Sequence, residues 1–312
     1  MNKFIVSSSP HIRTADTTPR IMLDVLIALL PTSIAGCILF GWRALLVLAV
    51  CVASSVLSEY VFNIVTKKEQ TIGDLSAVVT GLLLGLNLHA KAPIWQCVIG
   101  SVFAIIVVKC LFGGLGANFA NPAITGRVFM LICFSGSVAG GVATRFADVV
   151  SGATPLAVLK GSEGELPSLL EMFLGNRGGA IGETCGVALL IGFIYLVCRK
   201  VITWHTPVVF VATVFVLSLI VKQDLTVALY EVLGGGLLIG AIFMATDYVT
   251  SPPTKSGKVV FALGCGIITV LIRFWGAYPE GVSFAILFMN ILNPYICKLC
   301  APRAFGGVKN EN

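Results

Sequence analysis

The stretch EVLGGGLLIGAIFMATDYVTSPP, residues 231–253, is largely apolar but contains three consecutive glycines and ends in polar residues and prolines. A second interrupted stretch, DLSAVVTGLLLGLNLHA at residues 74–90, is short and rich in glycine. Within a bilayer such irregular backbone is tolerated only where it is buried in protein or lines a cavity. Because each stretch is the third apolar segment of its half of the chain, the pair predicts an inverted repeat with a central site. The alternative is that the glycines only allow close helix packing.

The composition points to the same class of protein. The 312-residue chain is 57% hydrophobic and 12% charged, whereas soluble domains carry about 25% charged residues. We therefore predict an all-α polytopic membrane protein of about ten transmembrane helices in two inverted five-helix repeats, since each span needs about 20 apolar residues. The ten predicted spans are residues 21–40, 43–65, 73–89, 93–112, 122–142, 184–202, 206–221, 226–246, 258–275 and 281–298. The net charge of +6 is not gathered in a basic tract, so no nucleic-acid partner is expected.

The charges also predict the topology. An even number of spans places both termini on one side, which then carries 14 of the 21 lysines and arginines, with seven on the other side. The positive-inside rule makes that side the cytoplasm, so we expect a multi-pass protein of the cell (inner) membrane, surrounded by lipid. The expected regions are a cytoplasmic N-terminal segment 1–20, a first repeat 21–142, an extracytoplasmic loop 143–183, a second repeat 184–298 and a cytoplasmic tail 299–312.

Within the long loop, DVVSGATPLAVLK at residues 148–160 is small and half polar. Its small residues leave the Thr154 hydroxyl unshielded, and Pro155 biases Thr154 towards an extended backbone. Such an exposed strip suits a modifying enzyme that must grip the chain. The alternative is a surface turn in which Thr154 is the N-cap of a helix that begins at Pro155.

Four further loops of small polar residues lie at helix ends, at residues 113–127, 175–185, 243–253 and 278–290. Glycine lets backbone approach a flat ligand, and helix N-termini present free N–H groups. Arg127 and Arg177 would suit a phosphate or an electron-rich ring oxygen. Each loop alone could equally be a capped turn.

Signals for independent catalysis are weak. The three histidines are far apart in sequence, and only Asp24 and Glu59 are candidates for ionisable residues deep in a span. Cys297 and Cys300 form a C-x-x-C pair, which can be redox-active or half of a metal site. No second pair or histidine lies nearby in sequence, so we interpret them as small apolar residues.

Several motifs resemble those of the D subunits of Rnf ion-translocating ferredoxin:NAD oxidoreductases and of the related B subunits of sodium-translocating NADH:quinone oxidoreductases. The motifs are SSSPHIR (7–13), GLGANFANPAITGR (114–127), GNRGGAIGETC (175–185), FMATDYVTSPP (243–253), PEGVSFAILFMN (279–290) and APRAFGG (301–307). They cover nearly the whole chain. One departure is Tyr248, where the family pattern has proline, which puts a local helix break in doubt.

The resemblance implies that Thr154 carries FMN through a phosphoester bond. Asp148, Ser151, Gly152 and Ala153 would complete the recognition sequence of a flavin transferase. Further candidate flavin ligands are Arg177, Glu183, Thr184, Asn121 and Arg127. Covalent attachment would explain why this stretch is polar and made of small residues, because another enzyme must reach the threonine to install the cofactor.

The resemblance also implies a urea-channel-like fold and a membrane electron-transfer protein that is not catalytic alone. Its complex would couple ferredoxin:NAD oxidoreduction to Na⁺ or H⁺ translocation. The implied partners within the complex are the G subunit, which carries covalent FMN, and the A and E membrane subunits. A second, non-covalent flavin such as riboflavin is allowed. Two alternatives from other classes are a channel or solute transporter without a redox role and a purely structural anchor.

Overall fold

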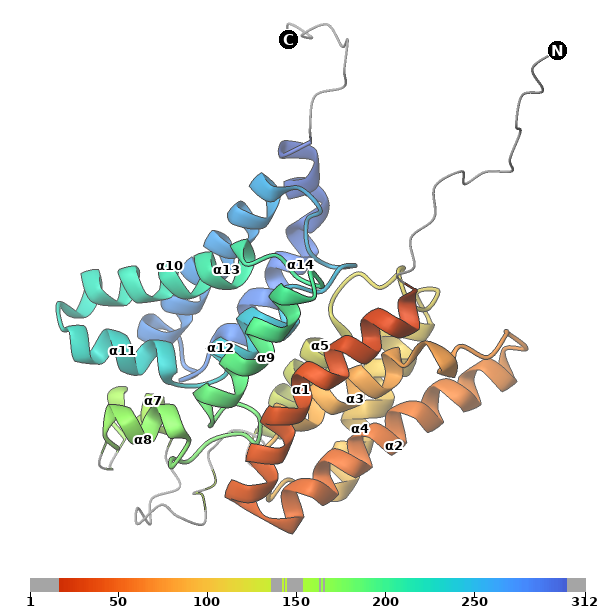
Figure 1. The fold of residues 1–312 in the computed structure, drawn as a ribbon, viewed down its shortest axis with the longest axis horizontal. Coiled ribbons are helices and arrows are strands. Elements are labelled where there is room, and N and C mark those ends of the chain that lie inside the picture. The colour runs from red at the N-terminus through yellow and green to blue at the C-terminus, as the bar shows by residue number, and fades with distance from the viewer. Residues whose placement is uncertain are drawn as a thin grey trace, which may run out of the picture.

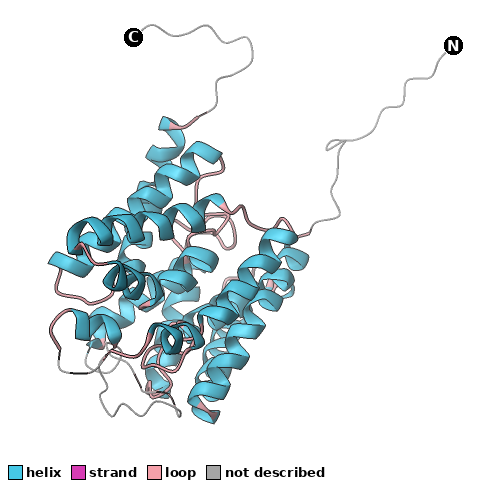
Figure 2. Cartoon of the chain, turned by 60° about the vertical axis from the view of Figure 1, so that its left-hand side comes forward, coloured by secondary structure: helices cyan, strands magenta, loops and turns pink. Residues whose placement is uncertain are grey.

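A computed structural model describes residues 17–135, 142, 144, 154–162, 164 and 166–301. These residues are predominantly helical, and their only β-pairing is an isolated antiparallel bridge between Val142 and Gly179 (Figures 1 and 2). The first half contains α1 (Thr18–Phe40), α2 (Trp42–Val65), η1 (Ile72–Asp74), α3 (Ser76–Leu86), α4 (Ile94–Val102), η2 (Phe103–Cys110) and α5 (Pro122–Cys133). The rest contains α7 (Pro155–Leu159), α8 (Leu169–Leu174), α9 (Gly186–Cys198), α10 (His205–Lys222), α11 (Leu225–Leu233), α12 (Leu237–Ile239), η3 (Gly240–Met244), α13 (Lys255–Trp275) and α14 (Val282–Leu299).

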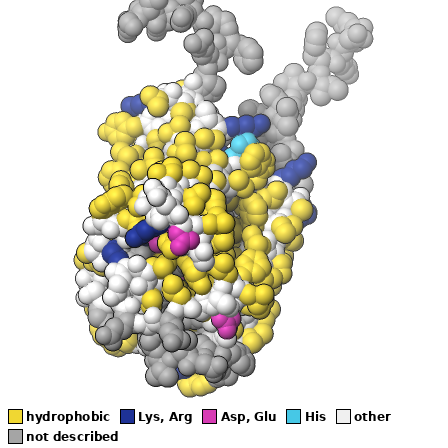
Figure 3. Space-filling view, turned by 90° about the vertical axis from the view of Figure 1, so that its left-hand side faces the viewer, with side chains coloured by type: hydrophobic (Ala, Val, Ile, Leu, Met, Phe, Trp, Pro, Cys, Tyr) yellow, Lys and Arg dark blue, Asp and Glu magenta, His cyan; other side chains and the backbone are white. Residues whose placement is uncertain are grey.

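The helices confirm an all-α polytopic membrane protein. Among the described residues, α1, α2, α10, α13 and α14 are long and apolar enough to cross a bilayer. A sixth span is broken, because α11 and the α12–η3 segment meet at an angle of 60°. The other four predicted spans contain shorter apolar helices, namely α3, α4 with η2, α5 and α9. The face of the molecule shown in Figure 3 is mostly apolar, as contact with lipid tails requires.

Two predicted spans are shorter than the sequence suggested. The span at 73–89 is α-helical only over Ser76–Leu86, and the one at 184–202 only over Gly186–Cys198. In the span at 122–142, α5 covers Pro122–Cys133, and residues 136–141 lie outside the described residues. For the two shorter spans the reason is a contact between irregular segments. The N–H of Gly182 donates to the Leu86 carbonyl at 2.7 Å, and the N–H of Ile181 donates to the Leu88 carbonyl at 2.9 Å. Each segment thus satisfies polar backbone that the other leaves free in the core.

The two halves pack in a matching pattern. The first helices of the halves, α1 and α9, pack against each other, and so do the fifth helices, α5 and α14. Within each half the second helix packs on the third and fourth, as α2 does on α3 and α4 and α10 does on α11 and α13. In Figure 1 the halves lie side by side, with α1 beside α9 at their junction. This arrangement supports the predicted repeat.

The ends of the helix bundle define two faces of the molecule. We call the end where α1 begins and α14 ends the terminal face, and the opposite end, where α7 and α8 lie, the loop face (Figures 1 and 2). Both terminal helices therefore emerge on one side, as an even number of spans requires.

Candidate functional site

Charged side chains from separate elements, most of them buried, meet beside the glycine break between α11 and α12. We call this group the arginine–glutamate cluster; it consists of Arg127, Arg177, Glu183, Glu231, Arg273 and Glu280. Arg127 on α5 pairs with Glu280 in the loop before α14 and donates to Asn87 Oδ1 at 2.5 Å. Arg273 near the end of α13 pairs with Glu231 on α11 at 2.9 Å. The cluster therefore links both halves of the chain.

The glycine run 234–236 lies at the centre of this cluster. A Cβ added at Gly236 would lie 3.1 Å from an Arg127 nitrogen and 3.4 Å from Glu183 Oε2. Gly235 has φ +61°, which favours glycine, and its added Cβ would lie 3.3 Å from an Arg273 nitrogen and 2.7 Å from Leu156. The break in the span thus lets charged side chains and α7 approach the backbone closely.

Thr154 is buried, contrary to the prediction that it is exposed. It is the N-cap of α7, only 7% of its surface is accessible, and its hydroxyl accepts a hydrogen bond from the Ala157 N–H at 3.3 Å. The exposure was overestimated because α7 folds onto the protein through Leu156, which packs against the glycine run. The N-cap geometry itself is the one that the alternative interpretation predicted. Asp148, Ser151, Gly152 and Ala153 lie outside the described residues.

Three of the predicted ligands come together in the loop before α9. Arg177 donates to the Glu183 carbonyl at 2.6 Å, and Glu183 Oε1 accepts from the Ala180 N–H at 2.7 Å. Arg177 Nε, Glu183 Oε2 and the Thr184 hydroxyl are buried without a hydrogen-bond partner within the described chain. Buried polar atoms normally have partners, so this group has the capacity to bind a polar ligand.

Glu183 is held in an unusual electrostatic environment. Burial, together with the negative charge of Glu280, raises the pKa of Glu183, and the positive charges of Arg127 and Arg177 oppose that rise. Burial lowers the pKa of Arg177. Ionisable groups whose pKa values are shifted by their surroundings are often found together at functional sites.

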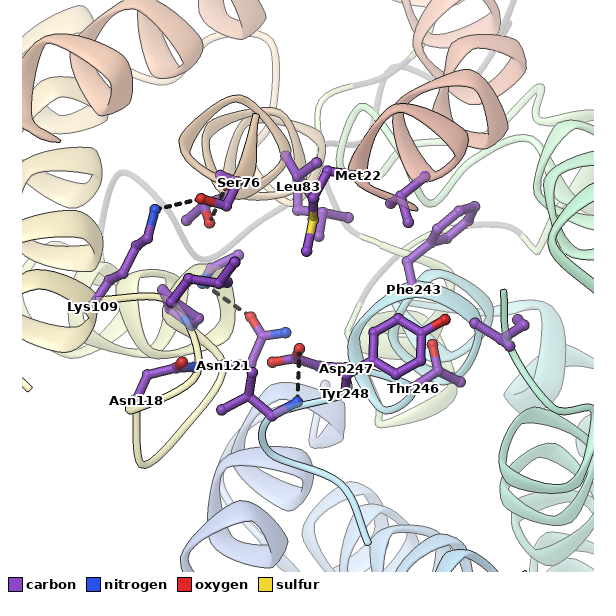
Figure 4. Close-up of a pocket in the computed structure, with 18 of the residues that line it drawn as sticks. Met22, Ser76, Leu83, Lys109, Asn118, Asn121, Phe243, Thr246, Asp247 and Tyr248 are labelled. Carbon is purple, nitrogen blue, oxygen red and sulfur yellow. Dashed lines mark hydrogen bonds between the residues drawn. The ribbon is translucent and has the colours of Figure 1, made fainter. Parts of the chain in front are cut away.

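Asn121 lies elsewhere, in a pocket that opens near the terminal face (Figure 4). This terminal-face pocket has about 80 Å³ of free space, and it lies between α1, α3, the 115–123 loop and the 243–249 turn. Asn121 caps α5 by accepting from the Ala123 and Ile124 N–H groups. Phe243 and Tyr248 lie on the opposite side of the pocket from Lys109. The predicted ligands therefore divide between two places.

Lys109, which was not predicted as a site residue, is only 2% exposed. Its ammonium group donates to both carboxylate oxygens of Glu59 at 2.9 Å and to the Ser76 hydroxyl at 2.5 Å. Thr71 donates to the same carboxylate at 2.6 Å. Arg273 and Glu280 were missed too. A charge inside an apolar run is the signal that could have found Lys109 and Arg273, because it must be paired or functional there.

Tyr248, the one departure from the family pattern, does not prevent the chain from turning. η3 ends at Met244, the following residues form turns, and the Tyr248 hydroxyl donates to the Val201 carbonyl. In the same turn, Asp247 accepts from the Thr250 hydroxyl at 3.0 Å. Burial raises the pKa of Asp247, and this hydrogen bond opposes the rise.

Comparisons with known proteins agree with the motifs. The model of the NQR2, RnfD, RnfE family matches residues 5–306. The D subunit of the Na⁺-translocating ferredoxin:NAD⁺ oxidoreductase complex of Acetobacterium woodii is 47% identical over 97% of this chain and 96% of its own. The D subunit of the proton-translocating ferredoxin:NAD⁺ oxidoreductase complex of Clostridium ljungdahlii is 40% identical over 98% and 97%. The D subunit of the ion-translocating oxidoreductase complex of Stutzerimonas stutzeri is 39% identical over 92% of each.

Proposed function

Because the chain belongs to the NQR2, RnfD, RnfE family, we propose that it is the electron-transferring D subunit of an ion-translocating ferredoxin:NAD⁺ oxidoreductase complex. In this proposal Thr154 carries FMN through a phosphoester. The observation that carries the proposal is the position of Thr154. It lies two residues before Leu156, which packs on the glycine run beside the arginine–glutamate cluster.

The residues around Thr154 fit a flavin phosphate and ring. Two arginines of the cluster, Arg127 and Arg273, lie near the glycine run, and Arg177 and Arg273 each have an unpartnered buried Nε within the described chain. Guanidinium groups suit phosphates and electron-rich ring oxygens. Because Thr154 is buried in the folded chain, the flavin transferase would act before α7 packs against the glycine run.

FMN supplies the electron-accepting chemistry, and this chain positions and tunes it. Lys160 donates to the Gly276 carbonyl at 2.5 Å and to the Tyr278 carbonyl at 2.8 Å, which fixes α7 to the end of α13. Arginines of the cluster would offset the negative charge of the phosphate and of a reduced ring. A covalent tether keeps the flavin at high effective concentration beside them.

A second, non-covalent flavin such as riboflavin is part of the proposal, with the terminal-face pocket as its place. Amide and hydroxyl side chains line the pocket, including Asn118, Asn121 and Thr246, and the rings of Phe243 and Tyr248 offer stacking surfaces. The free space of about 80 Å³ is too small for a three-ring system, so binding would require the aromatic side chains to move.

The proposed partners are the other proteins of such a complex, especially the G subunit with its covalent FMN and the A and E membrane subunits. The relatives' names specify Na⁺ in one case and protons in another, and we assign one of these two ions to the complex. We place the chain in the inner membrane with both termini in the cytoplasm, in agreement with the positive-inside rule.

The test of covalent attachment is Thr154→Val in the complex produced in its own host. Valine keeps the shape of threonine but lacks the oxygen, so the denatured chain should lose flavin fluorescence and the added mass of FMN. Loss of the N-cap should cost only about 1 kcal/mol, so the chain should still assemble into the complex. Ferredoxin-dependent NAD⁺ reduction should fall sharply.

Two controls accompany this test. Thr154→Ser keeps an oxygen and the cap, and should retain part of the flavin. Thr144→Val changes another buried threonine of the same loop, which donates to Asn176 at 3.0 Å, and should keep full covalent flavin. Covalent flavin in the Thr154→Val chain would show that attachment is at another residue and would overturn the proposal.

A further inference from the structure

We propose that the chain binds an anionic phospholipid at the terminal face, with its headgroup between Lys200 and Lys258 and an acyl chain in the groove along α10. This inference rests on the membrane location of the chain and does not depend on the flavin. Two adjoining cavities carry it, one polar and one apolar.

The headgroup pocket has a volume of about 310 Å³ and lies between the turn before α10, the 246–253 turn and the start of α13. Lys200 and Lys258 line it, and Lys258 donates to the Thr203 hydroxyl at 3.1 Å. Neither lysine forms an ion pair with a carboxylate in the part of the chain that the structure describes. Two lysines without a paired carboxylate and the Thr203 hydroxyl, all lining one pocket, suit a phosphate group.

The acyl groove has a volume of about 380 Å³ and is almost wholly apolar. It lies between α9, α10 and the broken span of α11, α12 and η3, and its lining includes Phe193, Val208, Val211 and Ile242. Part of this surface is exposed, Val208 by 44%. In a bilayer such a groove faces lipid, and a hydrocarbon chain matches its chemistry.

The two cavities adjoin along two elements. At the start of α10, Thr206 lines the headgroup pocket and Pro207 lines the groove. At the end of η3, Ile242 lines the groove and Thr246, one turn later, lines the headgroup pocket. A molecule with a charged head and an apolar tail would therefore occupy both at once, which neither a free anion nor an apolar helix does.

The headgroup pocket is separate from the terminal-face pocket. Val201, Ile202, Thr246 and Tyr248 line both and form the wall between them, and the Tyr248 hydroxyl donates to the Val201 carbonyl within that wall. Trp204, which is 53% exposed and stacks on His205 at 4.2 Å, lies beside the headgroup pocket in sequence. Exposed tryptophans are typical of the membrane–water interface, which is where a phospholipid headgroup lies.

The experiment uses the intact complex and a photoactivatable phosphatidylglycerol with the reactive group on an acyl chain. After illumination, mass spectrometry should place labels on residues 207–215 and 238–242 of this chain. Phosphatidylcholine with the same tail should label them much less. Lys200→Gln/Lys258→Gln should lower the apparent affinity of phosphatidylglycerol about 30-fold, because each lysine contributes about 1 kcal/mol to the binding free energy. The matched control Lys255→Gln/Lys298→Gln removes two exposed lysines outside the pocket and should change it less than about twofold.

The groove is tested with Ala212→Trp, which fills it, against Ile220→Trp, which lies two turns along α10 and outside it. Only Ala212→Trp should reduce labelling. Equal labelling by the two lipids would overturn the anionic headgroup. Displacement of the lipid by millimolar inorganic phosphate, with no effect of Ala212→Trp, would reveal a site for a free anion instead. If the labels appear on another protein of the complex and not on this chain, then that other protein covers the groove, and the proposal is overturned.

Discussion

Arg177 is the residue whose expected role the structure sharpens most. It is buried, one nitrogen donates to the Glu183 carbonyl, and Nε is left without a partner in the described chain. We expect Arg177→Ala to keep the covalent flavin, because the attachment is made at Thr154. Loss of a positive charge should make the flavin potential more negative, since a reduced flavin carries more negative charge. Spectroelectrochemistry of the complex measures this, with Arg199→Ala near the terminal face as control. An unchanged potential would leave Arg177 with a structural role only.

Glu183 should make the free energy of unfolding fall as the pH rises. Its pKa is raised in the folded chain, so the folded state binds more protons than the unfolded state above the ordinary carboxyl pKa of about 4.3. Stability therefore falls as pH rises from about 4.3 through the raised pKa. Glutamine keeps the acceptor for the Ala180 N–H and removes the charge. The melting temperature of Glu183→Gln relative to the unsubstituted protein should be higher at pH 8 than at pH 5. An equal difference at both pH values would contradict this assignment.

The buried Lys109–Glu59 pair allows a double-mutant cycle. Lys109→Met leaves the Glu59 carboxylate buried without its cation, which should cost about 3–5 kcal/mol of unfolding free energy. Lys109→Met/Glu59→Gln removes both charges and should recover most of that loss. Denaturant unfolding in detergent gives the comparison. A double variant no more stable than the single one would assign the cost to the hydrogen bonds of Ser76 and Thr71.

Several site residues could be selected from the sequence, but their grouping in space could not. Arg127, Arg177 and Glu183 could be selected because charged side chains beside glycine-rich loops are unusual in so apolar a chain. Their grouping with Glu280 could not be predicted, because Arg127 and Glu280 are 153 residues apart along the chain. Asn121 was grouped with them by motif, yet it caps α5 at the terminal-face pocket.

At the scale of elements, the glycine run should control how α7 docks. Gly235 has φ +61°, and a Cβ there would lie 2.7 Å from Leu156. Gly235→Ala should cost about 1–2 kcal/mol in backbone strain alone and should displace α7, so that covalent-flavin occupancy falls. Intact mass and melting temperature measure both effects. Gly73→Ala is the control, because an added Cβ there meets nothing within 4 Å and should leave both unchanged; equal behaviour of the two variants would contradict the docking role.

Helix positions were predictable, but some helix ends were not. Apolar length located all ten segments, since hydrophobicity is a local property. The ends of α3 and α9 depend on a contact between residues 86–88 and 181–182, which only the folded chain brings together. The third segment of the second half was correctly marked as broken, because three consecutive glycines interrupt a helix whatever surrounds them.

At the scale of the whole molecule, the packing supports the repeat that the interruptions in the sequence predicted. The broken span α11–α12–η3 and the short helix α3 each occupy the third position of their half, and the packing of α1 on α9 and of α5 on α14 joins equivalent helices. The matching position of these interruptions in the sequence carried the prediction. The arginine–glutamate cluster lies where the halves meet, because it joins α5 to the loop before α14.

Orientation in the membrane follows from charge and can be measured directly. Both terminal helices emerge at the terminal face, and α7 lies at the opposite face. Because the topology predicted from the sequence assigns 14 of the 21 basic residues to the side of the termini, that side should be cytoplasmic. In a background without reactive native thiols, Ser162→Cys, at an exposed position just after α7, should react with an impermeant maleimide in intact cells. Asn310→Cys should react only after lysis. The reverse pattern would place Thr154 on the cytoplasmic side, out of reach of a flavin transferase that acts outside.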